Sequence, residues 1–197
     1  MKKVVFSAVL ALGLAQPAFA QDGESAAAGK AGFRVEARAV LETPTVSSVF
    51  DDDDVYKLGS AMAFGGEVGF DFAVSNTVVL GPYATYEFST VENCEAGDCV
   101  SATDNYAIGL HGGVAVGSKG LVYAKVGYAS LGLEASIVTP ALNESERGGG
   151  VQGAIGYEHG FGENFYGRVE FGYADNGDIF GINFQRRHAG VALGARF

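Results

Sequence analysis

The stretch GVALGARF, residues 190–197, decides the fold because its apolar residues recur at every second position up to the last one. Val191, Leu193 and Phe197 share one parity, while Gly194 and Arg196 share the other. A period of two is typical of a β-strand whose two faces meet different surroundings. Terminal segments usually fray unless something holds them in place. The stretch therefore predicts a strand that keeps one apolar face to its last residue.

The first twenty residues have the pattern of a secretory signal. The basic start MKK precedes the apolar run Val4–Ala15 and a small-residue cleavage site at Ala18 and Ala20. An N-terminal membrane anchor is the alternative, but the run has 12 residues, whereas a spanning helix needs about 20. No other stretch is apolar enough for such a helix. We expect export, removal of residues 1–20 and, if the chain enters a membrane, insertion as strands.

The rest of the chain reads as one domain after a short lead-in. Residues 21–31 show no periodicity and are expected to form a flexible N-terminal segment before a domain at 32–197. Cys94 and Cys99, in CEAGDC, are the only cysteines. Export places them in an oxidising compartment, where we expect a disulfide. Free thiols are a less favoured alternative, and a metal site comes third because it needs more ligands.

Seven further segments alternate in the same way as the closing stretch. Long and short connections between the eight segments alternate strictly, which is typical of strands that run up and down through a layer. Both termini are then expected on the side of the short turns. The segments are 33–42, 62–72, 80–88, 106–116, 122–128, 151–158, 165–173 and 190–197; the long connections are 43–57, 90–104, 134–149 and 174–183; the short ones contain AVSN, GSKG and FGEN.

The polar face of these segments carries five cations, six anions and ten glycines. In a soluble sandwich or lipocalin-like barrel this face would meet water, where the glycines would only weaken the strands. Inside a narrow barrel, small residues leave room for long side chains, and uncompensated charge is costly. Near-balance of charge therefore favours an enclosed lumen. The predicted lumen charge network is Arg34, Glu36, Arg38, Glu67, Asp71, Glu87, Lys125, Glu158, Arg168, Glu170 and Arg196.

The long connections hold thirteen acids and two bases, including the run Asp51, Asp52, Asp53 and Asp54. The whole chain has a formal net charge of −10, so a basic surface for nucleic acid is not expected. The acidic run and DNGD at 175–178 offer oxygen ligands that suit a hard divalent cation. Their spacing departs from the EF-hand loop, and a solvated acidic loop is the favoured interpretation.

These features resemble the eight-stranded outer-membrane β-barrels of Gram-negative bacteria, a group that includes the opacity-protein-like porin family and the transmembrane domain of outer-membrane protein A. The motifs that carry the resemblance are GFRVEARAVLE (32–42), GGEVGFDF (65–72), YAKVGY (123–128), GRVEFGY (167–173) and VALGARF (191–197). The resemblance implies an all-β, eight-stranded antiparallel up-and-down transmembrane barrel with a polar, mostly filled interior. It also implies an outer-membrane location, contact with outer-membrane lipid and lipopolysaccharide, and a Phe197 that faces lipid and is read by the barrel-assembly machinery.

Three features depart from the family pattern. Pro82 falls within a strand and lacks a ladder donor, which predicts a bulge or a position at the rim. No peptidoglycan-binding domain follows the barrel in this sequence, so cell-wall tethering is not expected. Trp is missing, so the aromatic girdles are expected from residues such as Phe70, Phe72, Tyr86, Phe88, Tyr157 and Tyr173.

The leading functional interpretation is a monomeric protein with a structural or surface-interaction role through acidic extracellular loops. Side chains can fill an eight-stranded barrel, so the alternative is a narrow ion-conducting channel and not a wide pore. An outer-membrane lipid-modifying enzyme is less favoured, because no recognisable nucleophile motif surrounds His111, His159 or His188. We expect no catalytic residue, no bound metal, no cofactor and no nucleic-acid partner.

Overall fold

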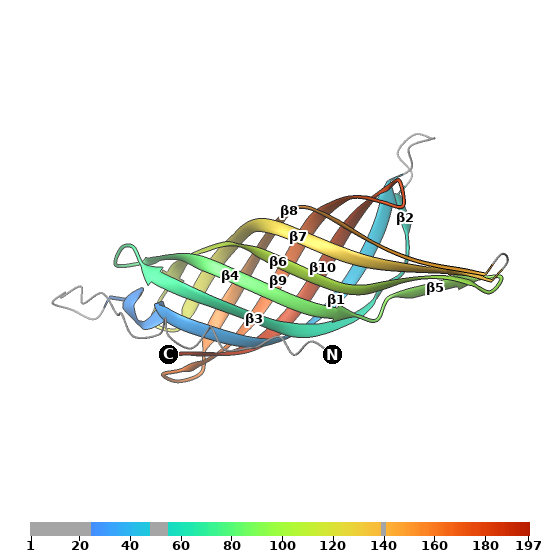
Figure 1. Cartoon of the computed structure of the whole chain (residues 1–197). Helices are drawn as coiled ribbons and strands as arrows, with labels where there is room; N and C mark the ends of the chain where they lie inside the picture. The colour runs from blue at the N-terminus through green and yellow to red at the C-terminus, as the bar shows by residue number, and fades with distance from the viewer. Residues whose placement is uncertain (1–24, 48–54, 139–140) are drawn as a thin grey trace, which may run out of the picture.

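The computed structural model describes residues 25–47, 55–138 and 141–197, and one antiparallel sheet closes on itself to form a barrel (Figure 1). The predicted signal peptide, residues 1–20, and the acidic run 51–54 lie outside the described residues. The elements are η1 (Ala28–Lys30), β1 (Gly32–Ser47), β2 (Val55–Lys57), β3 (Ala61–Ala73), β4 (Val78–Ser89), β5 (Glu92–Glu95), β6 (Asp98–Val116), β7 (Gly120–Ile137), β8 (Leu142–Gly160), β9 (Phe165–Ile179) and β10 (Ile182–Arg196).

Eight of these strands form the ring. Neighbours follow the order β10, β9, β8, β7, β6, β4, β3 and β1, and β1 closes the ring by pairing with β10 from Arg34↔Arg196 to Val46↔Phe184. Strand β2 pairs with β1, and β5 pairs with β6, outside the ring. The predicted eight-stranded up-and-down barrel is therefore confirmed. No helix in the described part of the chain is long and apolar enough to cross a membrane.

The two faces of the barrel are the reverse of those of a soluble protein. Large apolar side chains point outward: Leu193, Ile155 and Val126 expose 70%, 65% and 58% of their surface. Charged side chains such as Arg34 and Glu158 are fully buried. An apolar exterior around a polar interior is the arrangement of a transmembrane barrel. The face assignment made from the polar residues is thus confirmed.

Exposed aromatic side chains gather near the two ends of the strands. Phe33, Phe72 and Phe165 lie near the ends that carry the short turns, whereas Tyr86 and Phe88 lie near the opposite ends. Four of the residues expected in the girdles form two contacts, with ring centroids 4.7 Å apart for Phe70 and Phe72 and 5.0 Å apart for Tyr86 and Phe88. Phe and Tyr therefore supply aromatic bands at the positions where barrels of this kind meet the membrane interfaces.

Pro82 lies in the middle of β4 without a bulge, so the predicted bulge or rim position is wrong. The β4–β6 ladder runs continuously through Pro82↔Leu110. The β3–β4 ladder is instead interrupted between Gly69↔Tyr83 and Phe72↔Leu80, without a change of register. Proline has no N–H to donate, and the structure accommodates this by leaving a short gap in one ladder.

The strands at the end opposite the short turns are longer than the alternation predicts. Most of the connections at 90–104, 134–149 and 174–183 are paired strands, with two-residue turns at Ala96-Gly97 and Phe180-Gly181. All four turn residues have positive φ, as tight hairpins require. Alternation arises from the contrast between lipid and lumen, so it fades beyond the lipid although the backbone ladder continues. We call this end the long-strand end and the other the short-turn end.

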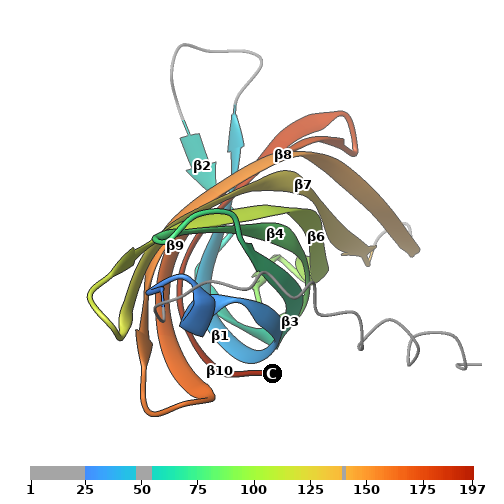
Figure 2. The same cartoon turned by 90° about the vertical axis from the view of Figure 1, so that its left-hand side faces the viewer.

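Residues 25–31 pack against the short-turn end and do not form an unpacked lead-in. Ala27 is fully buried against Val79 and Leu121, and its N–H donates to the Asn76 carbonyl at 3.1 Å. Figure 2, which views the barrel from this end, shows η1 lying over the opening. A single 3₁₀ turn is too short to produce a periodic pattern, which is why the sequence does not reveal it.

Lys30 fastens the same segment to the barrel. Its Nζ donates to the Lys119 carbonyl at 2.7 Å and lies 3.9 Å from Glu158 Oε1. Burial lowers the pKa of the Lys30 ammonium, and the nearby Glu158 carboxylate acts in the opposite direction. Lys30 thus joins the charges of the interior from outside the eight strands.

Candidate functional site

The eleven residues predicted for the lumen charge network all lie inside the barrel. Their exposed fractions run from 0% for Arg34, Asp71 and Glu158 to 7% for Arg38. Strand alternation explains the common face, since inward positions recur at every second residue of each strand. Ring closure then brings charges from β1, β3, β4, β7, β8, β9 and β10 into one connected set of ion pairs.

Glu67 and Glu170 form the centre of this network. Glu67 accepts from Lys125 at 2.6 Å, from Arg38 at 3.1 Å and, at shorter range, from Arg34. Glu170 accepts from Lys125 at 2.6 Å and from Arg38 at 2.7 Å. Each carboxylate therefore bridges several cations, as buried charges must if their desolvation is to be offset.

The network continues to the short-turn end through Asp71 and Glu158. Arg196 donates to Glu158 at 2.8 Å and to Asp71 at 3.2 Å. Arg168 donates to Glu158 at 2.8 Å and stacks over the Tyr123 ring at 4.6 Å from its centroid. The last inward residue of β10 is thereby tied to β3, β8 and β9.

Three members of the network were not predicted from the sequence. Glu42 accepts from Arg186 and from Ser89, and Arg186 also donates to Glu87 at 2.7 Å. Continuing the inward parity of β1 and β10 toward the long-strand end would have identified this pair. Lys30, from the segment before β1, is the third. With these additions, seven buried bases face seven buried acids among the described residues, and the network is balanced.

An apolar cluster lies toward each end of the charged interior. The larger cluster lies at the long-strand end and draws residues from β6, β7, β9, β10 and the segment after β4, so it spans the ring. The smaller one, Ala27 with Val79 and Leu121, lies under η1. Apolar side chains thus flank the charges toward both ends, among buried polar residues such as Lys30 and Thr45. The larger cluster comprises Val91, Ala102, Leu131, Leu133, Ile179 and Phe184.

The histidines have structural partners. His111 Nδ1 lies 2.9 Å from Asp71 Oδ1, and His188 Nε2 lies 3.4 Å from Glu170 Oε1, both inside the barrel. His159 is exposed on the outer surface. Among the described residues none of these contacts is to a serine, threonine or cysteine, so the geometry does not assemble a nucleophile with its base.

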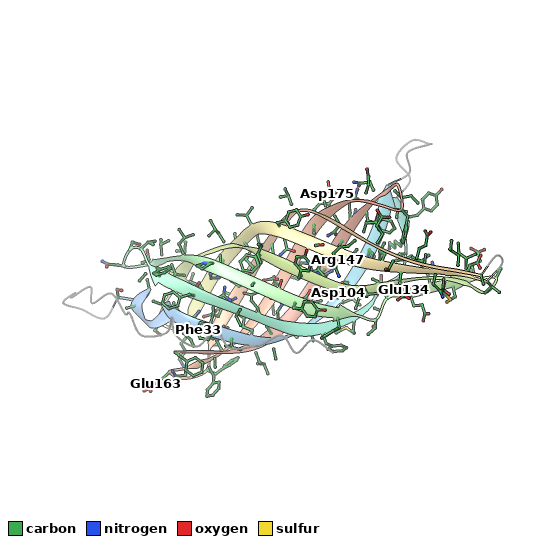
Figure 3. The ribbon with its side chains drawn as sticks, in the orientation of Figure 1. Phe33, Asp104, Glu134, Arg147, Glu163 and Asp175 are labelled. Carbon is green, nitrogen blue, oxygen red and sulfur yellow. A yellow bond between two sulfur atoms is a disulfide. The ribbon has the colours of Figure 1, made fainter. Side chains whose placement is uncertain are left out.

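Strands β5 to β8 continue past the rest of the barrel as a four-stranded sheet. We call β5 together with residues 98–104, 131–137 and 142–147 the protruding sheet; it extends to the right in Figure 1. Figure 3 shows Glu134 there and Glu163 at the opposite end of the molecule. The sheet has one base, Arg147, which pairs with Asp104. Its seven acids are Glu92, Glu95, Asp98, Asp104, Glu134, Glu144 and Glu146.

The two faces of the protruding sheet differ. Leu133 belongs to the apolar cluster inside the barrel, so residues of the same parity lie on the inner face. The register Val100↔Ala135↔Glu144 and the pair Ile137↔Leu142 assign the other strands. Near the tip, the inner face combines a partly exposed apolar patch of Val100, Ala135, Ile137 and Leu142 with the acids Glu95, Asp98 and Glu144. The outer face is polar and carries Glu92, Ser101, Glu134 and Ser145 in one row.

A disulfide between Cys94 and Cys99 joins β5 to β6, as predicted. Glu92 and the two sulfurs are the one group of three potential metal ligands among the described residues. The sulfurs are bonded to each other and cannot act as thiolate ligands. Asp175 and Asp178 are exposed at the end of β9, where Asp175 Oδ1 accepts from the Gly177 N–H at 3.1 Å.

Comparison with known proteins agrees with this architecture. Ail, the attachment invasion locus protein of Yersinia pestis, aligns with a TM-score of 0.57 at 11% identity over 83% of this chain and 99% of its own; that structure is a complex with the heparin analogue sucrose octasulfate. Neisserial surface protein A aligns with a TM-score of 0.55 at 16% identity over 84% of this chain and 97% of its own. At these identities the likeness establishes the fold alone. No curated protein matches the sequence.

The family of the chain is assigned from its sequence. The sequence matches the family described as outer membrane protein beta-barrel domain over residues 6–197. This range includes every strand of the ring and the closing pair of β1 and β10. The chain therefore belongs to the outer membrane protein beta-barrel domain family and is a protein of the outer membrane.

Proposed function

We propose that this is a surface-interaction protein whose protruding sheet binds a cationic, partly apolar partner outside the cell. The main support for this proposal is the inner face of the sheet tip, where Glu95, Asp98 and Glu144 border an apolar patch. An apolar centre with a polar rim is the usual anatomy of a protein interface. Short turns of outer-membrane barrels face the periplasm, so the long-strand end would face outward.

The charge of the sheet indicates the sign of the charge on the partner. Seven acids and one base produce a negative field that would attract cationic groups and raise the association rate. The Ail structure contains sucrose octasulfate, which is an anion. The acids of the present sheet would repel such a ligand, so we propose a basic peptide or protein surface as the partner.

The alternative of an ion channel receives less support. Two apolar clusters and a balanced set of ion pairs occupy the interior. Ion passage would require several buried pairs to break together, and each break leaves a costly buried charge. A lipid-modifying enzyme is also less well supported, since the three histidines contact Asp71, Glu170 and Tyr157. We therefore propose a role without catalysis or cofactor.

We also propose a monomer that contacts lipopolysaccharide in the outer leaflet and is recognised by the barrel-assembly machinery through Phe197. The Phe197 side chain is 70% exposed next to the seam, and its N–H donates to the Phe33 carbonyl at 2.8 Å. A terminal aromatic beside the closing strands is accessible before the ring closes, which supports its role as a signal.

Neutralising the inner-face acids tests the proposed function. In nanodiscs of zwitterionic phosphatidylcholine, we expect the parent protein to bind a fluorescent peptide of alternating Lys and Leu. The triple variant Glu95→Gln/Asp98→Asn/Glu144→Gln should bind about tenfold more weakly, corresponding to about 1.4 kcal/mol. Fluorescence anisotropy at low and high salt would measure both affinities.

A variant with the same change of charge provides the control. Glu92→Gln/Glu134→Gln/Glu163→Gln removes three acids from the outer face of the sheet and from the periplasmic end. At high salt we expect its affinity to remain within about twofold of the parent, because these carboxylates do not border the apolar patch and act only through a field that salt screens. Equal affinities of the parent and both variants, or preference for a Glu/Leu peptide, would contradict the proposal.

A further inference from the structure

The lipid-facing surface of the barrel contains a hollow of about 600 Å³ where β8, β9, β10 and β1 lie side by side. Two rows of outward positions cross these strands in register. One row is His159, Gly167, Leu193 and Ala37, and the other is Tyr157, Val169, Val191 and Ala39. A volume of this size lies within the range of small-molecule pockets, about 300–1,000 Å³.

Small residues between bulky ones create the hollow. Gly167, Ala37 and Ala39 lie where other outward positions of the barrel carry large apolar side chains. Phe161, in the turn after β8, borders Gly167: a Cβ added to that glycine would lie 2.8 Å from the Phe161 ring. The floor is apolar and the edge is aromatic, so the hollow suits a flexible hydrocarbon chain.

Polar groups gather at one end only. The Tyr157 hydroxyl lies 3.1 Å from His159 Nδ1, and both side chains line the hollow. His159 pairs with Gly120 at the start of β7, next to the short turn. Among the described residues His159 Nε2 has no hydrogen-bond partner. This end of the hollow therefore lies at the short-turn end, which faces the periplasm in barrels of this kind, and it offers an imidazole and a phenol hydroxyl.

We propose that the hollow is a discrete site for one glycerophospholipid of the periplasmic leaflet. One acyl chain lies over Gly167, Ala37 and Ala39, and the phosphate meets His159 and the Tyr157 hydroxyl. The hollow is continuous with the lipid-facing surface of the barrel, which supplies this occupant directly. The single polar end, at the periplasmic rim, matches a molecule with one anionic head and apolar tails. The site is independent of the protruding sheet and of the partner proposed for it.

Filling the hollow tests the site. The protein would be purified in detergent with added palmitoyl-oleoyl phosphatidylethanolamine and examined by native mass spectrometry. We expect the parent to retain one phospholipid, and Ala39→Phe to reduce the retained fraction about fivefold, a loss of about 1 kcal/mol. Ala124→Phe is the matched control, because Ala124 is an outward, exposed alanine of β7 outside the hollow; it should retain the lipid as the parent does.

A second variant tests the head-group end of the hollow, and a third can replace Ala39→Phe if that variant does not fold. His159→Ala/Tyr157→Phe should lower retention while leaving the hollow open. If Ala39→Phe does not give a compact, heat-modifiable band, Ala37→Leu fills the same space with a smaller side chain. Equal retention by the parent and the filled variants would overturn the proposal, as would retention of lipopolysaccharide in place of phospholipid or loss of lipid in Ala124→Phe as well.

Discussion

Replacing Glu67 by Gln is expected to lower the free energy of unfolding by about 3–5 kcal/mol, because it removes one partner from a buried ion-pair cluster. Glu67 is 1% exposed and accepts from Lys125 and Arg38, with Arg168 at 3.5 Å. Gln keeps the shape of the side chain but leaves the surrounding cations one negative charge short. Urea titration in lipid vesicles would measure the change. The chain has no Trp, so folding is followed by circular dichroism and by the mobility of unheated samples on SDS gels.

Glu163→Gln is the control for this substitution. Glu163 is exposed in the turn between β8 and β9, and Figure 3 shows it at the end of the barrel. We expect a change within about 0.5 kcal/mol, which is usual for surface positions. If Glu67→Gln and Glu163→Gln changed the stability equally little, the interior would have to be hydrated well enough to solvate the uncompensated cations.

Replacing Gly109 by Val is expected to prevent insertion, or to cost about 3 kcal/mol or more, because overpacking here is not relieved by side-chain rotation. A Cβ at Gly109 would meet the Val126 carbonyl and lie 2.6 Å from the Gly127 Cα, both backbone atoms of β7. It would also lie 2.9 Å from the Tyr83 ring. Strands β6 and β7 approach closely at this point, and a side chain would force them apart.

Gly153→Val is the control, because it also replaces a strand glycine by valine but without the close contacts found at Gly109. Gly153 is an exposed strand glycine of β8, and an added Cβ would meet only the Lys125 carbonyl, at 3.9 Å. We expect Gly153→Val to fold with parent-like yield, since valine favours strands. Comparable folding yields for Gly109→Val and Gly153→Val would refute the close approach of β6 and β7.

The ring and its faces could be predicted from the sequence because each inward residue is two positions from the next. The same parity, extended by a few residues, also reaches Glu42 and Arg186. It does not reveal that Glu67 lies among cations from β1, β7 and β9, because parity assigns a face and not a neighbour. The pairing depends on ring closure and register, which no single strand encodes.

Other features of the site leave no periodic signal. Neither face of the protruding sheet is uniformly apolar, so the sequence predicts a long connection that includes residues 134–137 and 142–147, although they are paired. The 3₁₀ turn at 28–30 is too short for a pattern. The lipid-facing hollow requires Gly167 and Ala37 to be brought side by side from β9 and β1, across β10.

The central claim is that the interior is a filled, charge-balanced core and that function lies on the surface of the barrel. Single-channel recording of the refolded protein in planar bilayers tests this claim most directly, after unheated samples have shown a compact, heat-modifiable band. We predict a silent membrane, because balanced ion pairs fill the interior and an apolar cluster lies toward each of its ends. Discrete conductance steps that change in size when Arg38 or Glu67 is replaced would contradict the claim and make the interior an ion pathway.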